Sequence, residues 1–272
     1  MTHRTIQQLF DLKGKTALVT GGSRGLGLQL AHALGEAGAK VLLSSRKASD
    51  LEEAVAELKA AGIDAQWIAA DCANEADIRS LADEAIRRLG GHVDILVNNA
   101  GAAWGSPAED HPVDAWDKVM NLNVRGYFIL SQHIAKHSMI ARKQGSIINV
   151  ASIAGLGGNP SGMNTIAYNT SKGAVINFTR ALAAEWGKYN IQVNCIAPGF
   201  ILTDLNRKMW EPAEMHAWLQ ATEANPNLGT PEDVAPLAVF LASPGANYIT
   251  GQLVAVDGGN STTQIWPFAP QS

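Results

Sequence analysis

Short apolar runs alternate with longer segments of helical periodicity along most of the chain. Strand-like runs are TALVT (16–20), KVLLS (40–44), AQWIAA, VDILVNN, SIINVAS, IQVNCIA and QLVAVDGG. Strict alternation of this kind predicts parallel strands joined by right-handed crossovers. No linker, composition shift or internal repeat divides the 272 residues. We therefore expect residues 1–272 to form a single doubly wound α/β domain with about seven parallel strands and helices on both faces.

Charge and composition exclude several classes of function. The net charge is −4, from 21 basic and 25 acidic residues, and lysines and arginines form no dense block, so binding to nucleic acid or to a membrane lacks electrostatic support. Cys72, Cys195 and the scattered histidines show no metal-ligand spacing, and no metal site is predicted. No run is apolar and long enough for a membrane helix or a signal peptide. We expect a cytoplasmic protein that acts on a small molecule.

A glycine-rich loop, TGGSRGLG at residues 20–27, separates the first predicted strand from the first predicted helix. Glycines let the loop turn sharply and let backbone N–H groups approach a pyrophosphate, and the helix N-terminus adds partial positive charge. A tight turn of purely structural role is the alternative, but the position after strand one favours a dinucleotide. The loop predicts a cofactor site of Rossmann type formed by Gly21, Ser23, Arg24, Gly25, Leu26 and Gly27.

The end of the second predicted strand indicates which dinucleotide binds. An NAD site places a carboxylate here for the ribose 2′-hydroxyl, but the sequence reads LLSSRKASD, with Ser45 and Arg46 at this point. Asp50 is too far along and belongs to the next helix. Arg46 and Arg24 of the glycine loop can both bind a 2′-phosphate through charge-assisted hydrogen bonds. The sequence favours NADP(H) over NAD(H), with surface cations lacking a partner as the alternative.

Tyr168 precedes Lys172 by four residues, and Ser152 lies sixteen residues before the tyrosine. Alone, the pair also fits a solvated helix face. A ketone that accepts hydride needs a proton donor, and a phenol has an ordinary pKa near 10. An ammonium one helical turn away, about 4 Å from the phenol oxygen, is worth about 4 kcal/mol and brings the pKa of Tyr168 towards 7 before desolvation. Ser152 can hold the substrate oxygen.

The order of these motifs identifies the resemblance. From Lys13 to about Gly259 the chain resembles the short-chain dehydrogenases/reductases, a family of nicotinamide-dependent oxidoreductases. The motifs that carry the resemblance are TGGSRGLG, Asp71, NNAG (98–101), Asn123 in NLNV, Ser152 in NVAS, YNTSK (168–172), PGFILT (198–203) and VDGG. Eight motifs in one register exclude coincidence.

The resemblance implies a role for each matching position. The catalytic set is Asn123, Ser152, Tyr168 and Lys172, in which a water bound at Asn123 links the lysine to solvent. Asp71 and Cys72 hold the adenine edge, and Lys172 binds the nicotinamide ribose beside Tyr168. The remaining cofactor-binding positions, which line the adenosine ribose, the wall behind the nicotinamide and its carboxamide or phosphate, are Asn98, Ala100, Gly101, Pro198, Gly199, Ile201 and Thr203.

One spacing departs from the family. Many members place the serine thirteen residues before the tyrosine, whereas the gap here is sixteen because GLGGNPSGMNT is longer. Its glycines and proline mark a loop, and loops absorb insertions without moving the flanking strand and helix. The catalytic geometry should survive, while the loop reshapes one side of the substrate pocket.

Substrate contacts are expected in three segments. Residues 203–228 form an amphipathic flap that can close on the substrate and contain Met209 and Trp210. Trp104 and Met163 should face the same space, together with Ser152 and Tyr168. Each apolar residue could instead pack on the body of the protein. The pocket lacks an identifiable arginine pair for a sugar-acid carboxylate.

Several functions remain open. We expect an NADP(H)-dependent reductase of ketones or aldehydes, or the matching alcohol dehydrogenase. Alternatives are a 3-oxoacyl-[acyl-carrier-protein] reductase, whose carrier-docking arginines correspond here to Ile129 and Ala184, and a polyol or sugar-acid dehydrogenase. An intact catalytic set opposes a cofactor-binding protein without catalysis.

The resemblance also implies a homotetramer that assembles through helices 124–142 and 166–187. The apolar tail QIWPFAP (264–270) suits burial against a neighbouring subunit or over a pocket.

Overall fold

The computed structural model describes residues 4–159, 162–203, 206–210, 212–222 and 224–262. Its described strands form one seven-stranded sheet in the order β3-β2-β1-β4-β5-β6-β7, and each neighbouring pair is parallel. The strands are β1 (Thr16–Thr20), β2 (Lys40–Ser45), β3 (Ala65–Ala69), β4 (Ile95–Asn98), β5 (Gly145–Val150), β6 (Ile191–Pro198) and β7 (Leu253–Val256). The predicted parallel α/β fold is confirmed.

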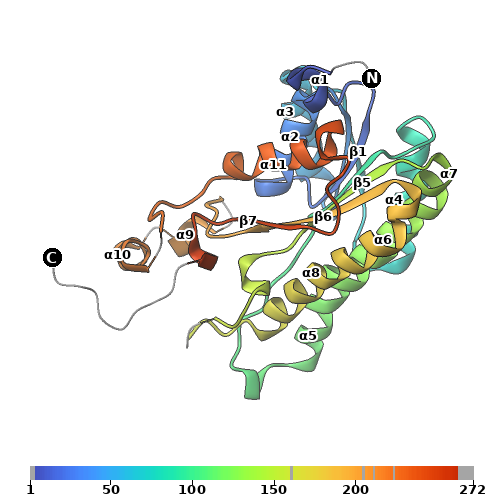
Figure 1. Cartoon of the computed structure of the whole chain (residues 1–272). Helices are drawn as coiled ribbons and strands as arrows, with labels where there is room; N and C mark the ends of the chain where they lie inside the picture. Colours follow the sequence, from blue (N-terminus) through green and yellow to red (C-terminus); the bar gives the residue numbers. More distant parts are fainter. Residues whose placement is uncertain (1–3, 160–161, 204–205, 211, 223, 263–272) are drawn as a thin grey trace.

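Helices cover both faces of this sheet (Figure 1). One layer contains α2 (Gly25–Glu36), α3 (Ala48–Ala60) and α11 (Pro231–Ala242), and the other contains α4 (Glu75–Arg88), α6 (Gly126–Ile134) and α8 (Ile166–Trp186). The central strand shows why both layers form. Along β1, Ala17 and Val19 pack into the first apolar core, and Leu18 packs into the second, because successive side chains of a strand point to opposite faces.

The order of the strands reverses at β1, which lies between β2 and β4. At such a point the loops that follow two neighbouring strands run to opposite faces of the sheet, and ligands of open α/β sheets bind in the resulting crevice. The glycine loop after β1 and the NNAG segment after β4 meet here. The fold therefore places two of the predicted motifs at the same edge of the sheet.

The segments predicted as helices 113–120 and 124–142 join into one helical run. It consists of α5 (Val113–Met120), a π-helical turn (Asn121–Arg125), α6, a second π-helical turn (Ala135–Met139) and α7 (Ile140–Arg142). Gly126, at the end of the first π turn, packs directly on the carbonyl of Cys72, so a side chain has no room there. Wide turns of this kind occur often at functional sites, and Asn123 lies within this one.

Short elements complete the described chain: α1 (Ile6–Phe10), 3₁₀ turns at Ala108–Asp110, Ile153–Gly155, Gly187–Tyr189, Pro244–Ala246 and Asn260–Thr262, and the flap helices α9 (Arg207–Trp210) and α10 (Ala213–Thr222). In Figure 1, α10 lies to one side of the sheet, beyond β7. Leu219 of α10 is buried, and the Trp218 ring meets the Phe200 ring edge-on at 5.4 Å between centroids. These contacts attach α10 to the chain that follows β6. The tail 264–270 lies outside the described residues.

Candidate active site

Lys172 occupies the centre of the candidate site. It lies on α8 with 3% of its surface exposed, and its Nζ donates a hydrogen bond to the carbonyl of Val150, at the end of β5, over 2.8 Å. The same amine lies 5.5 Å from the centroid of the Tyr168 ring. Ser152, which follows β5, lies within hydrogen-bonding reach of the Tyr168 phenol. The structure therefore brings together the three residues that the sequence predicts.

Asn123 joins three segments around this lysine. Its buried amide donates to the carbonyl of Ala102 and to Ser171 Oγ, each over 2.9 Å, and its Oδ1 accepts from the Ala102 N–H over 2.9 Å. Ser171 in turn donates to the Tyr168 carbonyl over 2.7 Å. A Cβ on Gly101 would lie 3.6 Å from the Lys172 amine. Asn123 thus fixes the chain after β4 against α8, and sequence reasoning missed Ala102 and Ser171 as its partners.

The pKa shifts correct one prediction. Burial raises the pKa of Tyr168, and the hydrogen bond with Ser152 opposes that rise only in part. Burial also lowers the pKa of Lys172 to about 8. The prediction that Lys172 lowers the pKa of Tyr168 towards 7 is therefore wrong. Burial disfavours the charged forms of both the phenol and the amine. The Lys172 amine is instead held by its hydrogen bond to the Val150 carbonyl and lies close to the rings of Tyr127 and Tyr168.

The glycine loop needs its glycines for two reasons. Gly21 and Gly25 have φ values of +64° and +54°, in the region that other residues rarely adopt. A Cβ on Gly27 would overlap the Gly21 carbonyl and the side-chain amide of Asn99. The backbone therefore turns tightly into the N-terminus of α2 at Gly25, and the first N–H groups of a helix suit a pyrophosphate.

Asn99 and Thr20, which sequence reasoning missed, connect this loop to the NNAG segment. Asn99 Nδ2 donates to the carbonyls of Thr20 and Gly21 over 3.0 and 3.2 Å. Thr20 Oγ1 accepts from the N–H groups of Asn99 and Ala100 over 3.0 and 3.1 Å. These four bonds cross from β1 to β4 at the point where the strand order reverses. The only signal in the sequence is that both residues are polar and end predicted strands.

The Asn98 side chain does not lie in the cofactor site that the resemblance implies. Its side chain is fully buried and donates to Ser131 Oγ and Asn149 Oδ1 over 3.0 and 2.8 Å. The amide therefore points into the core between β4, β5 and α6 and cannot line a ribose. Cys72 is similar: its thiol packs in the core, where burial raises its pKa to about 12. The neighbouring Asp71 is half-buried and accepts from the Ala73 N–H over 2.9 Å.

The two arginines predicted to bind the 2′-phosphate lie just before α2 (Arg24) and just after β2 (Arg46). Arg24 and Arg46 are exposed, and Ser45 ends β2 half-buried. Within the described part of the chain, neither arginine has an ion-pair partner. Asp50 lies in the first turn of α3, as expected. Two free guanidinium groups therefore flank a strand end that carries no carboxylate.

The PGFILT segment forms the opposite wall. Gly199 follows β6 and donates to the Val256 carbonyl over 3.0 Å, and its Cα packs so closely on Asp257 that a Cβ would lie 2.7 Å away. Thr203 reaches the glycine loop, where its methyl group would lie 3.5 Å from a Cβ on Gly25. Ile201 is buried and bridges to Gly229. Pro198 ends β6. The segment thus lies beside the glycine loop, across from NNAG.

The predicted substrate residues lie on three surface segments. Trp104 is 48% exposed after β4, and Met163 is 41% exposed in the long loop. These two segments are joined by a hydrogen bond from the Ser106 N–H to the Asn164 carbonyl over 2.8 Å. Met209 and Trp210 belong to α9, but their side chains lie outside what the structure describes.

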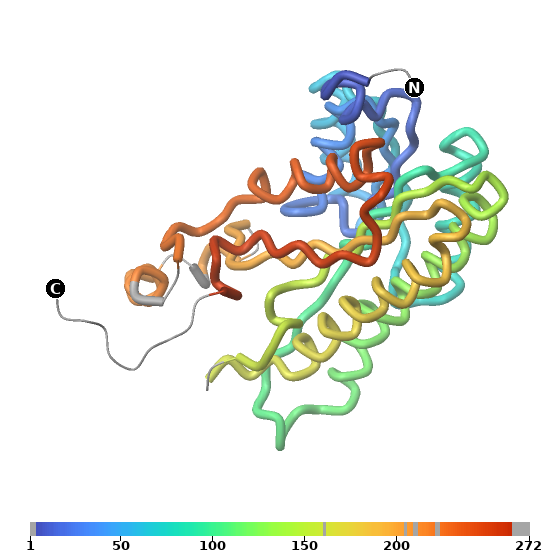
Figure 2. Tube along the Cα trace, viewed as in Figure 1, coloured from blue at the N-terminus to red at the C-terminus, as the bar shows by residue number. Residues whose placement is uncertain are grey.

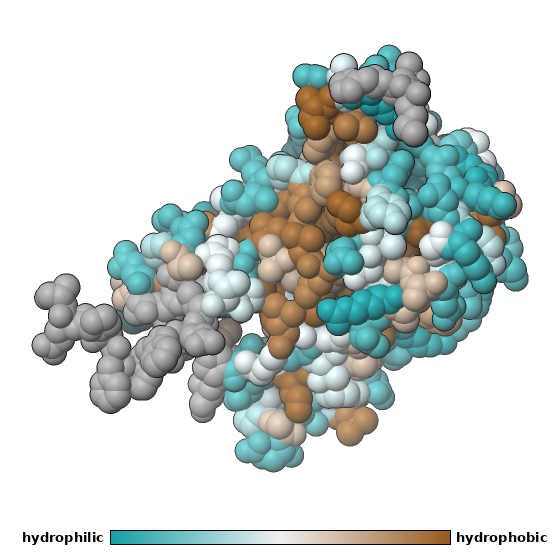
Figure 3. All heavy atoms as spheres, viewed as in Figure 1, coloured by the Kyte–Doolittle hydropathy of each residue, from teal (hydrophilic) through white to brown (hydrophobic). Residues whose placement is uncertain are grey.

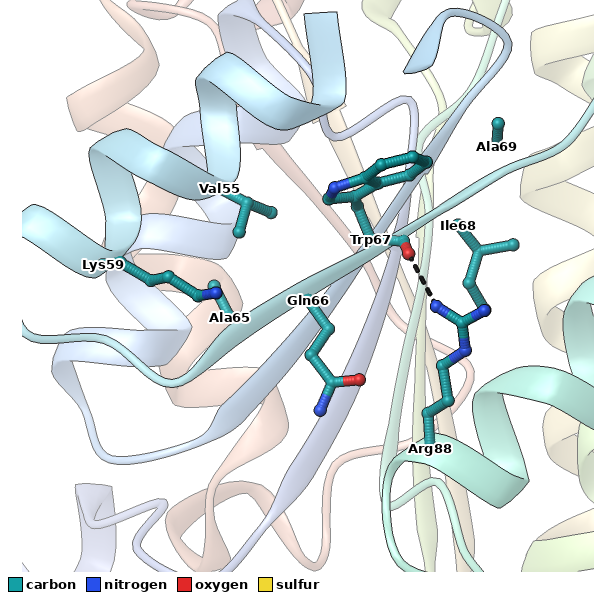
Figure 4. Close-up of a pocket in the computed structure, with 8 residues that line it drawn as sticks. All are labelled: Val55, Lys59, Ala65, Gln66, Trp67, Ile68, Ala69 and Arg88. Atoms are coloured by element: carbon teal, nitrogen blue, oxygen red, sulfur yellow. Dashed lines mark hydrogen bonds between the residues drawn. The ribbon is translucent and has the colours of Figure 1, made fainter. Parts of the chain in front are cut away.

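The structure contains two further cavities. A groove of ≈ 550 Å³ runs along the edge strand β3, with Lys59 of α3 on one side and Arg88 of α4, which donates to the Trp67 carbonyl over 3.1 Å, on the other (Figure 4). A second cavity of ≈ 280 Å³ lies between Phe200, Leu219 and Asp257. The described residues include no cluster of three potential metal ligands. No helix in the described ranges has the length and apolar character needed to span a membrane.

Comparison with known proteins agrees with this geometry. A family model described as Enoyl-(Acyl carrier protein) reductase matches residues 21–261. Gluconate 5-dehydrogenase of Gluconobacter oxydans is 37% identical over 92% of this chain and 96% of its own. The rhamnolipids biosynthesis 3-oxoacyl-[acyl-carrier-protein] reductase of Pseudomonas aeruginosa is 39% identical over 92% and 97%. The chain belongs to the short-chain dehydrogenase/reductase family.

A solved structure in this family shows the same fold. The gluconate 5-dehydrogenase from Burkholderia cenocepacia, in complex with NADP and tartrate, superposes with a TM-score of 0.89 at 35% identity and covers 95% of this chain and 99% of its own. The predicted resemblance is confirmed. As a member of the short-chain dehydrogenase/reductase family, the chain is an oxidoreductase.

Proposed function

We propose that the protein interconverts a ketone or aldehyde and an alcohol with NADP(H), as a single domain in which Tyr168 is the acid/base. The observation that carries the proposal is the convergence of Ser152 and Tyr168 beside a buried Lys172 amine. A carbonyl oxygen that gains negative charge needs both a hydrogen-bond donor and a proton source. The two hydroxyls supply them at the carboxyl edge of the sheet, where this fold binds ligands.

The residues of the crevice fit a phosphorylated dinucleotide. The glycine loop turns tightly into the N-terminus of α2, because Gly27 packs directly on the Gly21 carbonyl, and a helix N-terminus suits a pyrophosphate. Arg24 and Arg46 are exposed and have no ion-pair partner among the described residues, and Ser45 replaces the carboxylate that an NAD site uses. The gluconate 5-dehydrogenase structure that resembles this chain contains NADP. We assign Arg24 and Arg46 to the 2′-phosphate, the loop to the pyrophosphate, and Lys172 and Thr203 to the nicotinamide end.

The proposed chemistry follows from the positions of the side chains. When bound, NADPH supplies the hydride that adds to the carbonyl carbon. Ser152 donates to the carbonyl oxygen and stabilises its charge, and Tyr168 transfers the phenol proton to that oxygen, so that the C=O group becomes an alcohol. Lys172 binds Val150 and orients the phenol. Asn123 fixes the chain after β4 beside the lysine, where a bound water can return the proton from solvent.

The structure favours a free small molecule over a carrier-bound acyl chain. An acidic carrier protein needs exposed cations, but the expected docking positions hold Ile129, which is buried, and Ala184, which is exposed and neutral. One relative is named for a 3-oxoacyl carrier thioester and another for gluconate, so both substrate classes belong in the test. NADPH oxidation is measured with 5-keto-D-gluconate, cyclohexanone and a 3-oxoacyl carrier thioester. Turnover of a free ketone supports the proposal, and exclusive turnover of the thioester contradicts it.

The surface supports assembly into a homo-oligomer. Apolar residues gather on the face that carries α11 and the edge strand β7 (Figure 3), and all four residues of β7 are partly exposed. On the helical layer, Phe128 is 45% exposed and meets Phe178 edge-on. We propose a homotetramer that buries both surfaces. Cys72 and Cys195 are buried free thiols, in keeping with a reducing cytoplasm.

A further inference from the structure

Asn169, the residue after Tyr168, attaches the long loop to α8. Its Nδ2 donates to the carbonyls of Ala154 and Gly157 over 2.9 and 3.1 Å, and to Asn159 Oδ1 over 3.2 Å. The two amides pair reciprocally, because Asn159 Nδ2 also donates to Asn169 Oδ1 over 3.3 Å. One side chain on the proposed catalytic helix therefore binds both the beginning and the middle of the loop.

Thr165 closes the same network. It occupies the N-cap position of α8, yet its hydroxyl makes no capping bond to the helix, although capping is the usual role of threonine there. Its Oγ1 instead donates to Asn169 Oδ1 and accepts from Asn159 Nδ2, each over 2.8 Å. Asn159 Nδ2 also reaches the Met163 carbonyl over 3.3 Å. We call Asn159, Thr165 and Asn169 the loop clamp.

The clamp lies between the two hydroxyls of the proposed reaction. The loop begins at Ser152 and ends at α8, two residues before Tyr168. Figure 2 shows this segment beside the chain that joins β4 to α5, to which Asn164 binds through Ser106. Gly155 packs directly on the backbone of Lys172, so that a Cβ there would lie 2.5 Å from the Lys172 carbonyl carbon. The beginning of the loop therefore lies directly against the backbone of α8.

We propose that the loop clamp positions the wall of the substrate pocket that carries Met163, and thereby determines which carbonyl compounds bind. The inference rests on the proposed function, which assigns the space beside Ser152 and Tyr168 to the substrate. Asn159, Thr165 and Asn169 are positioning residues and act through the loop. Their side-chain hydrogen bonds within the described chain all go to residues of the loop or of the clamp itself and none goes to the glycine loop, so we expect an effect on binding of the carbonyl compound and not of the cofactor.

The test uses matched variants of Thr165. Thr165→Val keeps the shape of the side chain but removes its hydrogen bonds to Asn159 and Asn169. It removes no helix cap, because the Thr165 hydroxyl makes no capping bond. Thr165→Ser keeps the hydroxyl. Amide hydrogen exchange in residues 153–165 should be faster in Thr165→Val than in the wild-type protein, and unchanged in Thr165→Ser. Thr165→Val should raise the KM for the ketone about tenfold. The ketone used is whichever of 5-keto-D-gluconate and cyclohexanone the wild type reduces faster. The KM for NADPH should stay constant.

Two further variants complete the design. Asn169→Asp replaces the donor that faces the Ala154 and Gly157 carbonyls and should raise the ketone KM at least as much, while Thr170→Val makes the threonine-to-valine change at an exposed position of α8 and should leave it unchanged. Unchanged exchange in Thr165→Val would overturn the clamp, and so would an equal rise in both KM values. A wild-type protein that reduces no ketone contradicts the proposed function instead, while the exchange measurement still decides on the clamp.

Discussion

The Lys172 amine lies 5.8 Å from the centroid of the Tyr127 ring and 5.5 Å from the centroid of the Tyr168 ring. Tyr127 is buried on α6, and its hydroxyl donates to the Val150 carbonyl over 3.4 Å, the same oxygen that accepts from Lys172. The rings of Tyr127 and Tyr168 and the Val150 carbonyl therefore all lie close to the amine. Faces of aromatic rings attract cations, which offsets part of the cost of burying the ammonium.

This burial makes stability depend on pH in a defined direction. The pKa of Lys172 is lowered to about 8 from the ordinary 10.5, so the unfolded chain binds this proton more tightly than the folded protein. Taken alone, Lys172 makes the folded state more stable as pH rises from about 8 to 10.5, by about 3 kcal/mol in total. Cys72, Cys195, Tyr127 and Tyr168 have raised pKa values and act in the opposite direction, because the unfolded chain releases their protons before the folded protein does. The comparison with Lys172→Met separates the contribution of the lysine. Urea unfolding should show a pH-dependent gain for the wild type relative to Lys172→Met; parallel curves would contradict it.

Asn99 should control cofactor binding. Asn99→Asp places a carboxylate against the carbonyls of Thr20 and Gly21, which now accept hydrogen bonds from the amide. The glycine loop loses two of its four hydrogen bonds to the NNAG segment, and we expect the Kd for NADPH to rise at least about tenfold. Fluorescence titration measures it. The control is Asn74→Asp, because Asn74 uses only its amide oxygen, as the cap of α4, and an aspartate keeps that acceptor. Equal affinities of the two variants would refute the role of Asn99.

Arg46 should discriminate between the two nicotinamide cofactors. A charge-assisted hydrogen bond to a phosphate contributes about 1.5–3 kcal/mol, so Arg46→Ala should weaken NADPH binding by about tenfold to a hundredfold. NADH carries no 2′-phosphate, and its Kd should remain constant. Lys59→Ala, which removes an exposed cation on α3 in the groove away from the crevice, is the control. Equal losses of NADPH and NADH affinity would contradict the assignment of Arg46 to the phosphate.

Gly27 should tolerate no side chain. Gly27→Ala puts a methyl group against the Gly21 carbonyl and the Asn99 amide, and relief of that overlap moves the loop at a cost of about 1–3 kcal/mol in unfolding free energy. NADPH affinity should fall with it. Gly187→Ala is the matched control, because no atom lies within 4 Å of its Cβ position. Chemical unfolding and NADPH titration of both variants measure the difference, and a stable Gly27→Ala that binds NADPH normally would show that the loop is looser than described.

The sequence predicts the fold and most of the site because both depend on local patterns. Seven apolar runs define the strands, and the spacing between Tyr168 and Lys172 places both on one side of α8 once the helix forms. Asn98 and Asn99 show the limit. Adjacent residues at a strand end point in opposite directions, and which amide enters the core depends on the packing of Ser131 and Asn149 from distant segments.

The electrostatics could not be predicted from spacing either. A four-residue separation correctly suggests that an ammonium lies near the phenol, but it contains no information about burial. Tyr127, Val150 and Cys195 come from α6, β5 and β6, and together they exclude water from the Lys172 amine. Desolvation then outweighs the hydrogen bond with Ser152, which reverses the expected direction of the Tyr168 pKa. The close contact between Gly126, which follows the π-helical turn at Asn123, and the Cys72 carbonyl likewise joins segments far apart in the sequence.

The most direct test of the acid/base assignment is the kcat of ketone reduction in Tyr168→Phe, measured beside the Kd for NADPH of the same variant. Removal of a positioned proton donor should lower kcat by about 10²–10⁴-fold, while NADPH still binds as it does to the wild type. A variant that binds NADPH normally and reduces the ketone at the wild-type rate would contradict the assignment of Tyr168.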